Sequence, residues 1–397
     1  MLYVFYVLIG LLIAQGVFSL IEGLKFRAFV RRAVRDPLDD FTPKATIIAP
    51  SKGLDLELEE NVSALFSLDY PDYDIIFAVA TADDPSRQLL DRVIAEHPER
   101  QARVIVAGLS ERRSEKINNL LVALEHVAPP VEALVFVDLD ARVTRSWLRA
   151  LVSPLADVRV GAATGYRWYF PRQGGFWSAL LSAWNGSVAT TLGGHGRNFA
   201  WGGATAILRE TFNRIGVEHL WQGAVSDDYA LTRAVQQAGL AVAFQPRCLV
   251  ASLERASFAS LFEFTTRQVT ITRIYRPAVW WTGFASHLLF CLGFFGGLAA
   301  TACQVFRGGS STGFITMLAI IYILGSLKGW LRIVSAREAL PGMARDLNRV
   351  WWMFCLLWPM VSVLFLCNFM GSAATRRIVW RGVSYHMRSA SETRVVR

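Results

Sequence analysis

The stretch Val135-Phe136-Val137-Asp138-Leu139-Asp140 decides the fold class of this chain. Its short, uninterrupted apolar part predicts a strand buried on both faces, as in a parallel sheet covered by helices. The two acids then emerge at the carboxyl edge of the sheet, where open α/β proteins bind their ligands. Mg²⁺ or Mn²⁺ binds through one or two carboxylates plus substrate phosphates. The stretch therefore predicts a metal site at Asp138 and Asp140, since a helix cap near Ser146 would explain only one of the two acids.

The region 44–255 around this stretch alternates short β-like runs with amphipathic helical runs. The strand-like runs, which are mostly apolar, occupy residues 45–49, 75–80, 103–107, 134–137 and 241–244. Between them, apolar residues recur at helical spacing, as in Ile117, Leu120, Leu121, Leu124 and Val127. This alternation predicts an α/β domain with a mostly parallel sheet and flanking helices on both faces.

The composition indicates that part of the chain lies in a membrane. Of its 397 residues 53% are hydrophobic, with 25 Phe and 13 Trp, which is more apolar than one ordinary soluble domain. Four apolar stretches, 2–20, 280–306, 314–334 and 350–369, each approach the roughly 20 residues that a spanning helix needs. We therefore expect an integral, multi-pass membrane protein with an N-terminal anchor over residues 1–24 and a membrane region over residues 280–372.

Basic residues flank the apolar stretches. The formal net charge is +9, and the excess positive charge gathers in a linker over residues 25–43 and a tail over residues 373–397. This placement suits anionic lipid headgroups, and we expect a lipid bilayer rather than nucleic acid as the partner. By the positive-inside rule the linker puts the region 44–255 on the cytoplasmic face, in a bacterial inner membrane or in the endoplasmic reticulum or Golgi of a eukaryote.

The last apolar stretch is not expected to cross the membrane as a straight helix. Four full spans would put the basic tail on the outer side, against the positive-inside rule. Pro359 interrupts the stretch and can turn it into a re-entrant or interfacial hairpin. Before the membrane region, apolar residues separated by polar ones predict interfacial amphipathic helices over residues 256–279.

Three other segments carry polar groups near predicted strand ends. Pro50-Ser51-Lys52-Gly53 follows the first strand and could hold a nucleotide, although a plain turn explains it as well. In Asp83-Asp84-Pro85 an acid could accept hydrogen bonds from a uracil ring, but Asp before Pro is equally an ordinary helix start. Lys116 and Asn118 open an amphipathic helix, where they could bind a phosphate or sugar hydroxyls or simply form its solvated end.

A second acidic pair, Asp227-Asp228, has two readings. Ser226 before two acids is typical of a capped helix start, where negative charge favours the helix dipole by roughly 0.3 to 1 kcal/mol. The pair also follows Trp201-Gly202-Gly203-Ala204, a small-residue turn that would let a sugar approach the backbone. In the first interpretation Asp227 and Asp228 only stabilise the start of a helix, and in the second they belong to a site that binds a sugar.

Four motifs together carry a resemblance to a known family. They are Pro50 to Gly53, Leu68-Asp69-Tyr70-Pro71 with the Asp83-Asp84-Pro85 segment after it, Lys116-Ile117-Asn118-Asn119-Leu120, and Ser226-Asp227-Asp228-Tyr229. Over nearly its whole length the chain resembles membrane-bound family 2 inverting glycosyltransferases. Within them it is similar to ceramide glucosyltransferases and to bacterial relatives that glycosylate lipids. The resemblance implies a nucleotide-binding domain of the GT-A type.

The resemblance also implies roles for single residues. Asp138 and Asp140 match the acids that bind a divalent cation, of which the ceramide enzymes have only the first. Asp228 matches the catalytic base. Contacts to the nucleotide and the substrates are expected from Pro50, Lys52, Asp83, Asp84, Lys116, Asn118, Gly202, Gly203, Asp227 and Gln268.

The final family motif is altered in this chain. Where the family usually has (Gln/Arg)-x-x-Arg-Trp, the sequence reads Phe264-Thr265-Thr266-Arg267-Gln268. Arg267 keeps the expected catalytic cation for the departing diphosphate, and a basic residue that snorkels from an interfacial helix is the alternative. The missing Trp argues against an enzyme that makes a polymer.

We therefore expect an inverting glycosyltransferase that moves a hexose, first of all glucose, from a UDP-sugar to a lipid hydroxyl. Ceramide and diacylglycerol are the expected acceptors, Asp228 removes the hydroxyl proton, and the product is a β-linked glycolipid. Three alternatives remain at this point. They are a hopanoid or polyisoprenyl-phosphate glycosyltransferase, a processive polysaccharide synthase, and a membrane scaffold without enzymatic activity.

Overall fold

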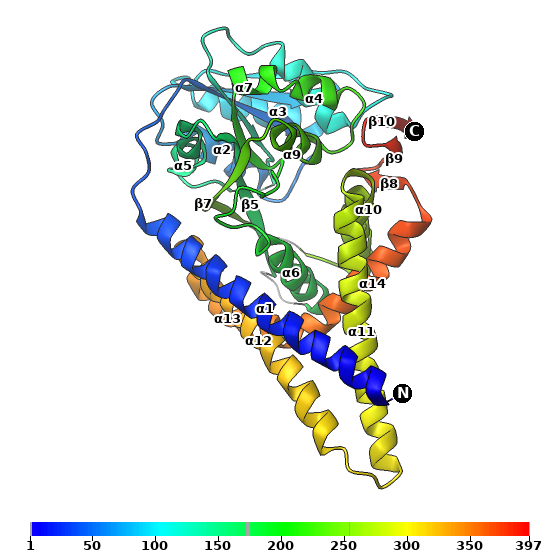
Figure 1. Ribbon diagram of the computed structural model, residues 1–397. Coiled ribbons are helices and arrows are strands. Elements are labelled where there is room, and N and C mark those ends of the chain that lie inside the picture. Colours follow the sequence, from blue (N-terminus) through cyan, green and yellow to red (C-terminus); the bar gives the residue numbers. More distant parts are fainter. Residues whose placement is uncertain (1, 141, 172–174, 254, 397) are drawn as a thin grey trace. The chain divides into compact units, whose positions relative to one another are not determined.

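The computed structural model describes residues 2–140, 142–171, 175–253 and 255–396. They form two compact units, each built from separate parts of the chain (Figure 1). The sheet unit comprises Arg32–Tyr169, Thr191–Leu253 and Arg376–Arg397. The helical unit comprises Met1–Arg31, Phe170–Thr190 and Glu254–Thr375.

The sheet unit is built on seven strands. They are β1 (Ala45–Ser51), β2 (Tyr73–Val79), β3 (Ala102–Val106), β4 (Ala133–Val137), β5 (Val160–Phe170), β6 (Ala204–Leu208) and β7 (Ala241–Leu253). Their order in the sheet is β3-β2-β1-β4-β6-β5-β7. The pairs β1-β2, β1-β4 and β2-β3 are parallel, whereas β6 runs antiparallel to β4 and β5. The predicted class, a mostly parallel sheet with flanking helices, is confirmed.

Strand β4 is buried on both faces, as its apolar run predicts. Val135 and Val137 point into one hydrophobic core, and Leu134 and Phe136 point into the other. All five residues of the strand are buried. Because neither face meets water, no polar residue interrupts the run, and the first acid stands directly after the strand.

Helices cover both faces of this sheet. The first face is covered by α2 (Leu58–Phe66), α3 (Pro85–Glu96), α5 (Trp147–Val152) and the short η1 (Ser153–Ala156). The second face is covered by α4 (Glu115–Leu124), α7 (Arg209–Arg214), α8 (Val217–Trp221) and α9 (Asp227–Gln237). On α4 the predicted periodic residues Ile117, Leu120 and Leu121 are buried, which fixes the helix against the sheet.

The basic segment after residue 375 is an ordered part of the sheet unit. It forms β8 (Arg377–Trp380), β9 (Val383–Ser389) and β10 (Glu392–Val396) in the antiparallel order β10-β9-β8. The side chains of Tyr385 and Met387 are buried. The backbone N–H of Val395 donates to the carbonyl of Glu111 at 2.9 Å, and the backbone N–H of Glu115 donates to the Tyr385 hydroxyl at 3.2 Å. These contacts attach the segment, predicted only as a basic tail, to the beginning of α4.

The helical unit consists mainly of helices, several of them long and apolar. They are α1 (Leu2–Arg35), α6 (Phe176–Ala189), α10 (Phe258–Tyr275), α11 (Pro277–Phe306), α12 (Thr312–Ala339), η2 (Pro341–Met343), α13 (Ala344–Leu356) and α14 (Trp358–Ala374). Among the described residues, three helices, in α1, α11 and α12, are long and apolar enough to cross a membrane. The pair α13 and α14 would make a fourth, although it bends by 69° between Leu356 and Trp358.

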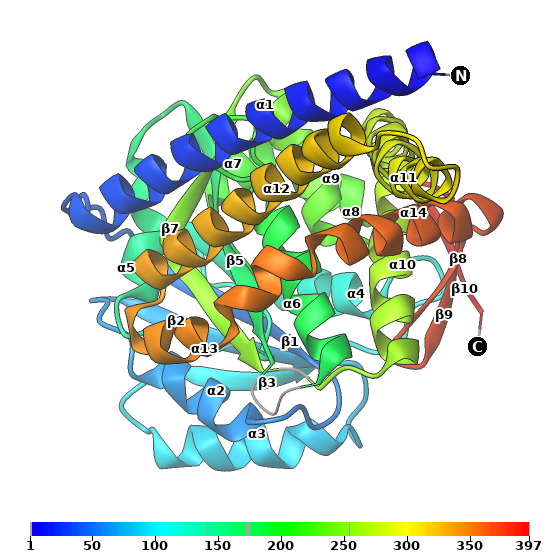
Figure 2. The same ribbon diagram turned by 90° about the horizontal axis from the view of Figure 1, so that it is seen from below.

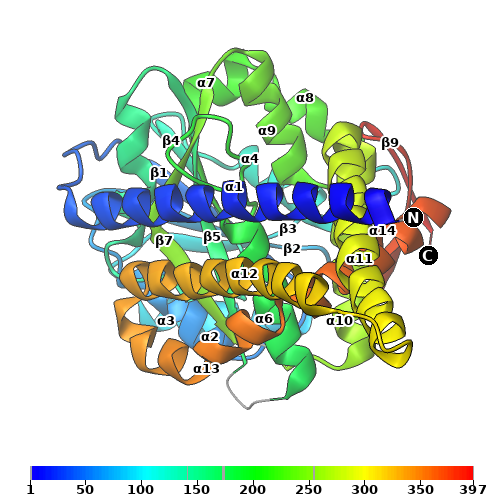
Figure 3. The same cartoon turned by 60° about the horizontal axis from the view of Figure 1, so that its bottom comes forward.

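Small residues let these helices pack closely. In Figure 2 helices α1 and α12 run side by side. A Cβ added at Gly16 would lie 3.0 Å from Leu324, and one at Gly23 would lie 3.2 Å from Leu331. Figure 3 shows α11 crossing α1 near its beginning, where a Cβ at Gly293 would meet Leu12 at 2.5 Å. Such close approach of backbones is typical of helices that associate within a bilayer.

The bend between α13 and α14 lies at the predicted interruption. Pro359 occupies the first turn of α14, where its missing N–H breaks no helical hydrogen bond. The crossing of the membrane by this pair, the orientation of the chain in the membrane and the domain boundaries stay predictions.

Candidate active site

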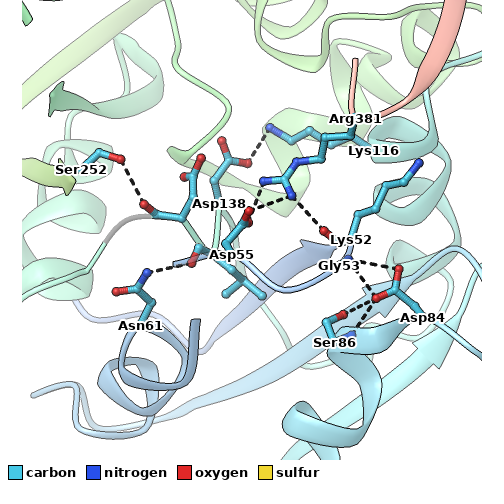
Figure 4. Close-up of polar contacts among 12 residues, drawn as sticks. Lys52, Gly53, Asp55, Asn61, Asp84, Ser86, Lys116, Asp138, Ser252 and Arg381 are labelled. Carbon is cyan, nitrogen blue, oxygen red and sulfur yellow. Dashed lines mark hydrogen bonds and ion pairs between the residues drawn. The ribbon is translucent and has the colours of Figure 1, made fainter. Parts of the chain in front are cut away.

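The site begins where β4 ends. Asp138 Oδ1 lies 2.9 Å from Lys116 Nζ, and Asp138 Oδ2 lies 3.1 Å from a guanidinium nitrogen of Arg167. The same guanidinium reaches Asp140 Oδ2 at 2.7 Å. The two acids of the opening stretch are therefore held at the sheet edge by two cations from α4 and β5 (Figure 4 shows the contact to Lys116).

Lys116 also joins this acidic pair to the second one. Its ammonium group lies 3.3 Å from Asp227 Oδ2, so one half-buried lysine contacts a member of each pair. The Ser114 hydroxyl caps α4 by accepting from the N–H of Ile117 at 3.2 Å, which fixes the helix turn that carries Lys116. Folding thus brings Asp138 and Asp227, which are distant in the sequence, into contact with the same ammonium group.

The titratable groups of this cluster have pKa values that are shifted in different directions. Burial raises the pKa of Asp227 to about 6, with Lys116 opposing the rise and Asp228 and Asp138 adding to it. Burial alone would raise the pKa of Asp138, but Lys116 and Arg167 outweigh burial and hold it below the usual value. For Lys116 the two aspartates overcome burial and raise its pKa. At neutral pH the pair Asp138 and Lys116 is therefore ionised.

Asp228 lies at the start of α9 beside the buried Asp227. It is half-buried, and its Oδ1 accepts a hydrogen bond from the N–H of Tyr229 at 2.7 Å and one from the Ser226 hydroxyl. The Ser226 hydroxyl itself caps the helix by accepting from the same N–H at 3.3 Å. The predicted cap at the start of α9 is therefore present. Asp228 is the more accessible acid of the pair, because Asp227 is buried.

Gly202 and Gly203 make room for protein side chains. A Cβ at Gly202 would lie 2.1 Å from Asp227 Oδ2 and 2.7 Å from Lys116 Nζ. A Cβ at Gly203 would lie 2.1 Å from the Trp201 ring. The absence of a side chain thus makes room for the ends of Asp227 and Lys116 at Gly202 and for the Trp201 ring at Gly203, and the approach of a sugar to this turn stays a prediction.

The turn after β1 is fixed by pairing within the sheet on one side and by an ion pair on the other. Pro50 is paired within the sheet, opposite Ala78 of β2. Lys52 forms an ion pair with Glu115 in the first turn of α4. The two predicted nucleotide-binding segments, after β1 and at the start of α4, are thus linked through their own side chains.

Asp84 has the structural role that the sequence left open. It caps α3 by accepting from the N–H of Ser86 at 2.9 Å, and it also accepts from the N–H of Gly53 at 3.0 Å (Figure 4). Its neighbour Asp83 is exposed, and a hydrogen bond from Thr81 lowers the pKa of Asp83. Of the two acids, Asp83 has the freer carboxylate for a uracil ring, and that role stays a prediction.

Asn118 is fully engaged within the protein. Its amide nitrogen donates to the carbonyls of Ala107 and Gly108 at 3.2 and 2.9 Å. Its amide oxygen accepts from Arg113 Nε at 3.0 Å. In this arrangement Asn118 fixes the loop after β3, and the structure does not test its predicted contact to a substrate.

Two arginines of the site were missed from the sequence. Arg167 is a lone charge among the aromatic residues of β5, and its guanidinium carbon lies 4.8 Å from the centre of the Trp201 ring. An arginine inside such an apolar strand is a signal that could have found it, because a buried charge needs partners. Arg381, in the turn between β8 and β9, donates to both carboxylate oxygens of Asp55. No local pattern marks Arg381, since its partner is distant in the sequence.

The remaining predicted residues, Arg267 and Gln268, lie on α10 in the helical unit. The guanidinium carbon of Arg267 lies 5.3 Å from the ring centre of Phe264, one turn earlier on the helix. The backbone carbonyl of Gln268 accepts from the Thr272 hydroxyl at 2.8 Å. Their catalytic and substrate-binding roles stay predictions.

The residues at the end of β4 suit a divalent cation. Within the described parts of the chain no group of three or more His, Cys, Asp or Glu side chains could hold a metal, so a site here would use two carboxylates and substrate oxygens. Asp140 Oδ1 is buried and has no hydrogen-bond partner in the described structure. An unpaired buried carboxylate oxygen is costly, and a hard cation such as Mg²⁺ or Mn²⁺ would satisfy it.

Known proteins with similar sequences are ceramide glucosyltransferases. The chain is 27% identical over 93 residues to ceramide glucosyltransferase 3 of Caenorhabditis elegans, a match that covers 23% of this chain and 20% of that protein. It is 28% identical over 102 residues to the ceramide glucosyltransferase of Komagataella phaffii, covering 26% and 19% of the two chains. The matched segment thus spans about a fifth of the length of these relatives.

Solved structures of glycosyltransferases are also similar. A mannosyltransferase from Pyrobaculum calidifontis, in complex with GDP-Man and Mn²⁺, matches 92% of this chain and 99% of its own at 17% identity and a TM-score of 0.49. GalNAc-T7 with UDP, GalNAc and Mn²⁺ matches 59% of this chain and 48% of its own at 15% identity and a TM-score of 0.41.

A family model matches nearly the whole sequence. It covers residues 9–393 and is described as glycosyl transferase family 21. The resemblance to ceramide glucosyltransferases is confirmed, and the chain is a glycosyltransferase that belongs to family 21.

Proposed function

We propose that this glycosyltransferase moves a hexose, with glucose as the first candidate, from a UDP-sugar to the hydroxyl of a membrane lipid such as ceramide or diacylglycerol. Transfer occurs in one displacement and inverts the anomeric carbon, so the product is a β-glycolipid. The single observation that carries the proposal is Lys116, whose ammonium group contacts Asp138 at 2.9 Å and Asp227 at 3.3 Å. The contact supports the proposal because it joins Asp138, after the buried strand, to Asp227, at the start of α9, in a chain of family 21.

The donor diphosphate binds at the carboxyl end of β4. Lys116 supplies positive charge there because Asp138 and Asp227 keep it protonated. A divalent cation held by Asp138 and Asp140 would offset the negative charge that develops on the leaving diphosphate. Arg167 orients both carboxylates, since its guanidinium contacts each of them.

Asp228 is the general base. Hydrogen bonds from Ser226 and from the N–H of Tyr229 fix its Oδ1, and the carboxylate stays half-exposed. It accepts the proton of the acceptor hydroxyl as the oxygen attacks the anomeric carbon from the face opposite the diphosphate. Asp227 is buried against Lys116 and serves to position that lysine.

The apolar helices support a lipid as the acceptor. In the part of the chain that the structure describes, three helices are long and apolar enough to cross a bilayer, and the pair α13 and α14 adds a bent apolar segment. An enzyme anchored in this way meets amphiphiles whose headgroups lie at the membrane surface. The partial match to ceramide glucosyltransferases supports ceramide as the first lipid to test.

The test uses the full chain purified in detergent. It is incubated with a panel of UDP-sugars and lipids, with and without Mn²⁺ or Mg²⁺, and products are identified by mass and by the anomeric coupling in NMR spectra. We expect a single β-linked hexose on a lipid hydroxyl, formed faster with metal. An α-linked product would overturn the single displacement, and a polymer or a sugar on polyisoprenyl phosphate would favour the alternatives. Absence of UDP release with every donor and lipid would overturn the proposal.

A further inference from the structure

The turn between β8 and β9 has an unusual residue at a strained position. Trp380 pairs with Val383, so Arg381 and Gly382 form a two-residue hairpin loop. Both have positive φ, 47° for Arg381 and 80° for Gly382. Such loops usually carry Asn or Gly at the first position, because a longer side chain is disfavoured there. Backbone strain of this kind is found most often at functional sites.

The side chain of Arg381 points into the candidate site. Figure 4 shows its guanidinium beside Lys116 and directed at the loop after β1. One nitrogen donates to the carbonyl of Lys52 at 2.8 Å and to Asp55 Oδ1 at 3.0 Å, and another donates to Asp55 Oδ2 at 2.6 Å. The bidentate contact fixes the plane of the guanidinium group.

Arg381 also acts on the acids at the end of β4. Its charge adds to that of Lys116 and Arg167 in opposing the effect of burial on Asp138. Burial opposes a rise in the pKa of Arg381, but Asp55, Asp140 and Asp138 raise it above the usual value. Lys116 and Arg167 contact the acids at this strand end, and the guanidinium group of Arg381 lies beside Lys116, so three cations contribute positive charge at the predicted place of the donor diphosphate.

The β8–β9 hairpin contacts both segments that are expected to hold the donor. Besides the Arg381 contact to Lys52, the Tyr385 hydroxyl accepts from the N–H of Glu115, next to Lys116. The hairpin is also attached through buried residues such as Met387, so Arg381 is not its sole link to the unit. A role in attachment alone does not explain why an arginine occupies this strained position and extends its side chain beside Lys116.

We infer that Arg381 is a donor-binding residue: its guanidinium, with Lys116, receives the diphosphate of the nucleoside diphosphate sugar. This inference rests on the proposed function, which supplies the diphosphate. The planar guanidinium suits two phosphate oxygens, and Asp55 holds it ready in the absence of the donor. The segment 376–397 is then part of the donor site.

The test measures equilibrium binding of UDP and of uridine to the full chain in detergent at a fixed Mg²⁺ concentration. We expect Arg381→Ala to weaken UDP binding by about 10- to 100-fold, the loss of one charged hydrogen-bonding contact, and to leave uridine binding within about twofold. Arg381→Lys should recover part of the UDP affinity. Arg388→Ala is the matched control, because Arg388 lies on β9 of the same small sheet and forms an exposed ion pair with Glu392.

Asp55→Asn separates binding from attachment. If Arg381 only fastens the loop after β1, removing either partner should weaken UDP and uridine alike, and that result overturns the inference. If Arg381 binds the diphosphate, Asp55→Asn should preserve or tighten UDP binding because the guanidinium is released. Unchanged UDP binding in Arg381→Ala would overturn the inference and leave the proposed function intact. A wild-type protein that binds no nucleoside diphosphate would overturn both.

Discussion

The two acidic pairs of the site are alike in sequence and different in surroundings. Asp138 and Asp140 follow a buried strand, where Lys116 and Arg167 pair with their carboxylates. Asp227 and Asp228 begin a helix, where one acid is buried and the other is half-exposed. In the proposed function the first pair binds a divalent cation, whereas in the second pair Asp227 positions Lys116 and Asp228 accepts the proton. Adjacent acids therefore do not imply a shared role.

The largest expected effect comes from the half-exposed acid. Asp228→Asn should lower the rate of sugar transfer by about 1,000-fold, because an amide cannot accept the hydroxyl proton. The fold should be retained, since Ser226 still caps α9. Product formation per minute checks the rate, and circular dichroism checks the fold. Glu210→Gln, in the first turn of α7, is the control and should keep full activity. Full activity in Asp228→Asn would remove the distinction between the two pairs.

The strand-end pair should respond mainly in stability. Asp138→Asn leaves Lys116 and Arg167 each without one buried partner, and we expect the free energy of unfolding to fall by about 3 kcal/mol. Asp140→Asn should cost less, because only Arg167 loses a contact. Denaturant unfolding of the two variants measures the difference.

The control for this pair is Asp157→Asn. Asp157 forms a largely exposed ion pair with Arg159 in its own loop, so its loss should change stability by less than about 1 kcal/mol. Equal losses in Asp138→Asn and Asp157→Asn would show that burial does not set the first pair apart.

Gly202→Ala tests the link between the pairs. The added Cβ would meet Asp227 Oδ2 at 2.1 Å and Lys116 Nζ at 2.7 Å, so these side-chain ends must move. We expect activity to fall by roughly 10-fold through misplacement of Lys116, with little change in stability. Gly193→Ala is the control, because its Cβ would meet its nearest neighbour at an ordinary 3.4 Å. An unchanged rate in Gly202→Ala would mean that the contact of Lys116 to Asp227 does not matter for transfer.

The smallest expected effect is a pH dependence of the free energy of unfolding, which has opposite signs for Asp227 and Asp138. The folded pKa of Asp227 is about 6, above its ordinary 3.8, so the folded state binds more protons between these values. Stability from this group is present in full below pH 3.8 and is lost as the pH rises through about 6. Asp138 has the opposite sign, because its lowered pKa gives stability that is lost only as the pH falls below its ordinary value.

Thermal unfolding in metal-free buffer measures this dependence. Between about pH 7 and pH 4.5 the wild-type protein should gain roughly 1 to 2 kcal/mol relative to Asp227→Asn. Identical pH profiles for the two proteins would contradict the assignment of Asp227 as the buried acid that titrates. Asp228→Asn keeps Asp227 but removes one of the charges that raise the pKa of Asp227, so this variant should show a smaller pH dependence than the wild-type protein.

The position of Asp138 and Asp140 at a strand end can be predicted from the sequence because a strand buried on both faces appears as an uninterrupted apolar run. Val135 and Phe136 face opposite cores, so β4 has no polar residue before Asp138. The amphipathic spacing of α4 predicts its place on the sheet for the same reason. Local periodicity therefore gives the sheet, the helix and the edge at which the site lies.

The cations were harder to predict because their partners are distant in the chain. The charge of Arg167 within an apolar strand is explained by its ion pairs with Asp138 and Asp140. These pairs could not be predicted because β5 was not predicted as a strand. The position of Arg381 depends in the same way on an ion pair with Asp55, which is distant in the sequence. Short polar strands rich in arginine are read from sequence as a basic tail. Contacts between distant segments, rather than local pattern, decide these positions.

The order of the chain has a consequence for how the enzyme is made. The sheet unit is interrupted twice by parts of the helical unit, and its third part, Arg376–Arg397, follows every described helix that can cross a membrane. A ribosome therefore synthesises all four acids long before Arg381 and Tyr385. If Arg381 binds the donor diphosphate, as inferred above, the donor site stays incomplete until this third part has been synthesised. The gain of activity would then follow the synthesis of every described helix that can cross a membrane.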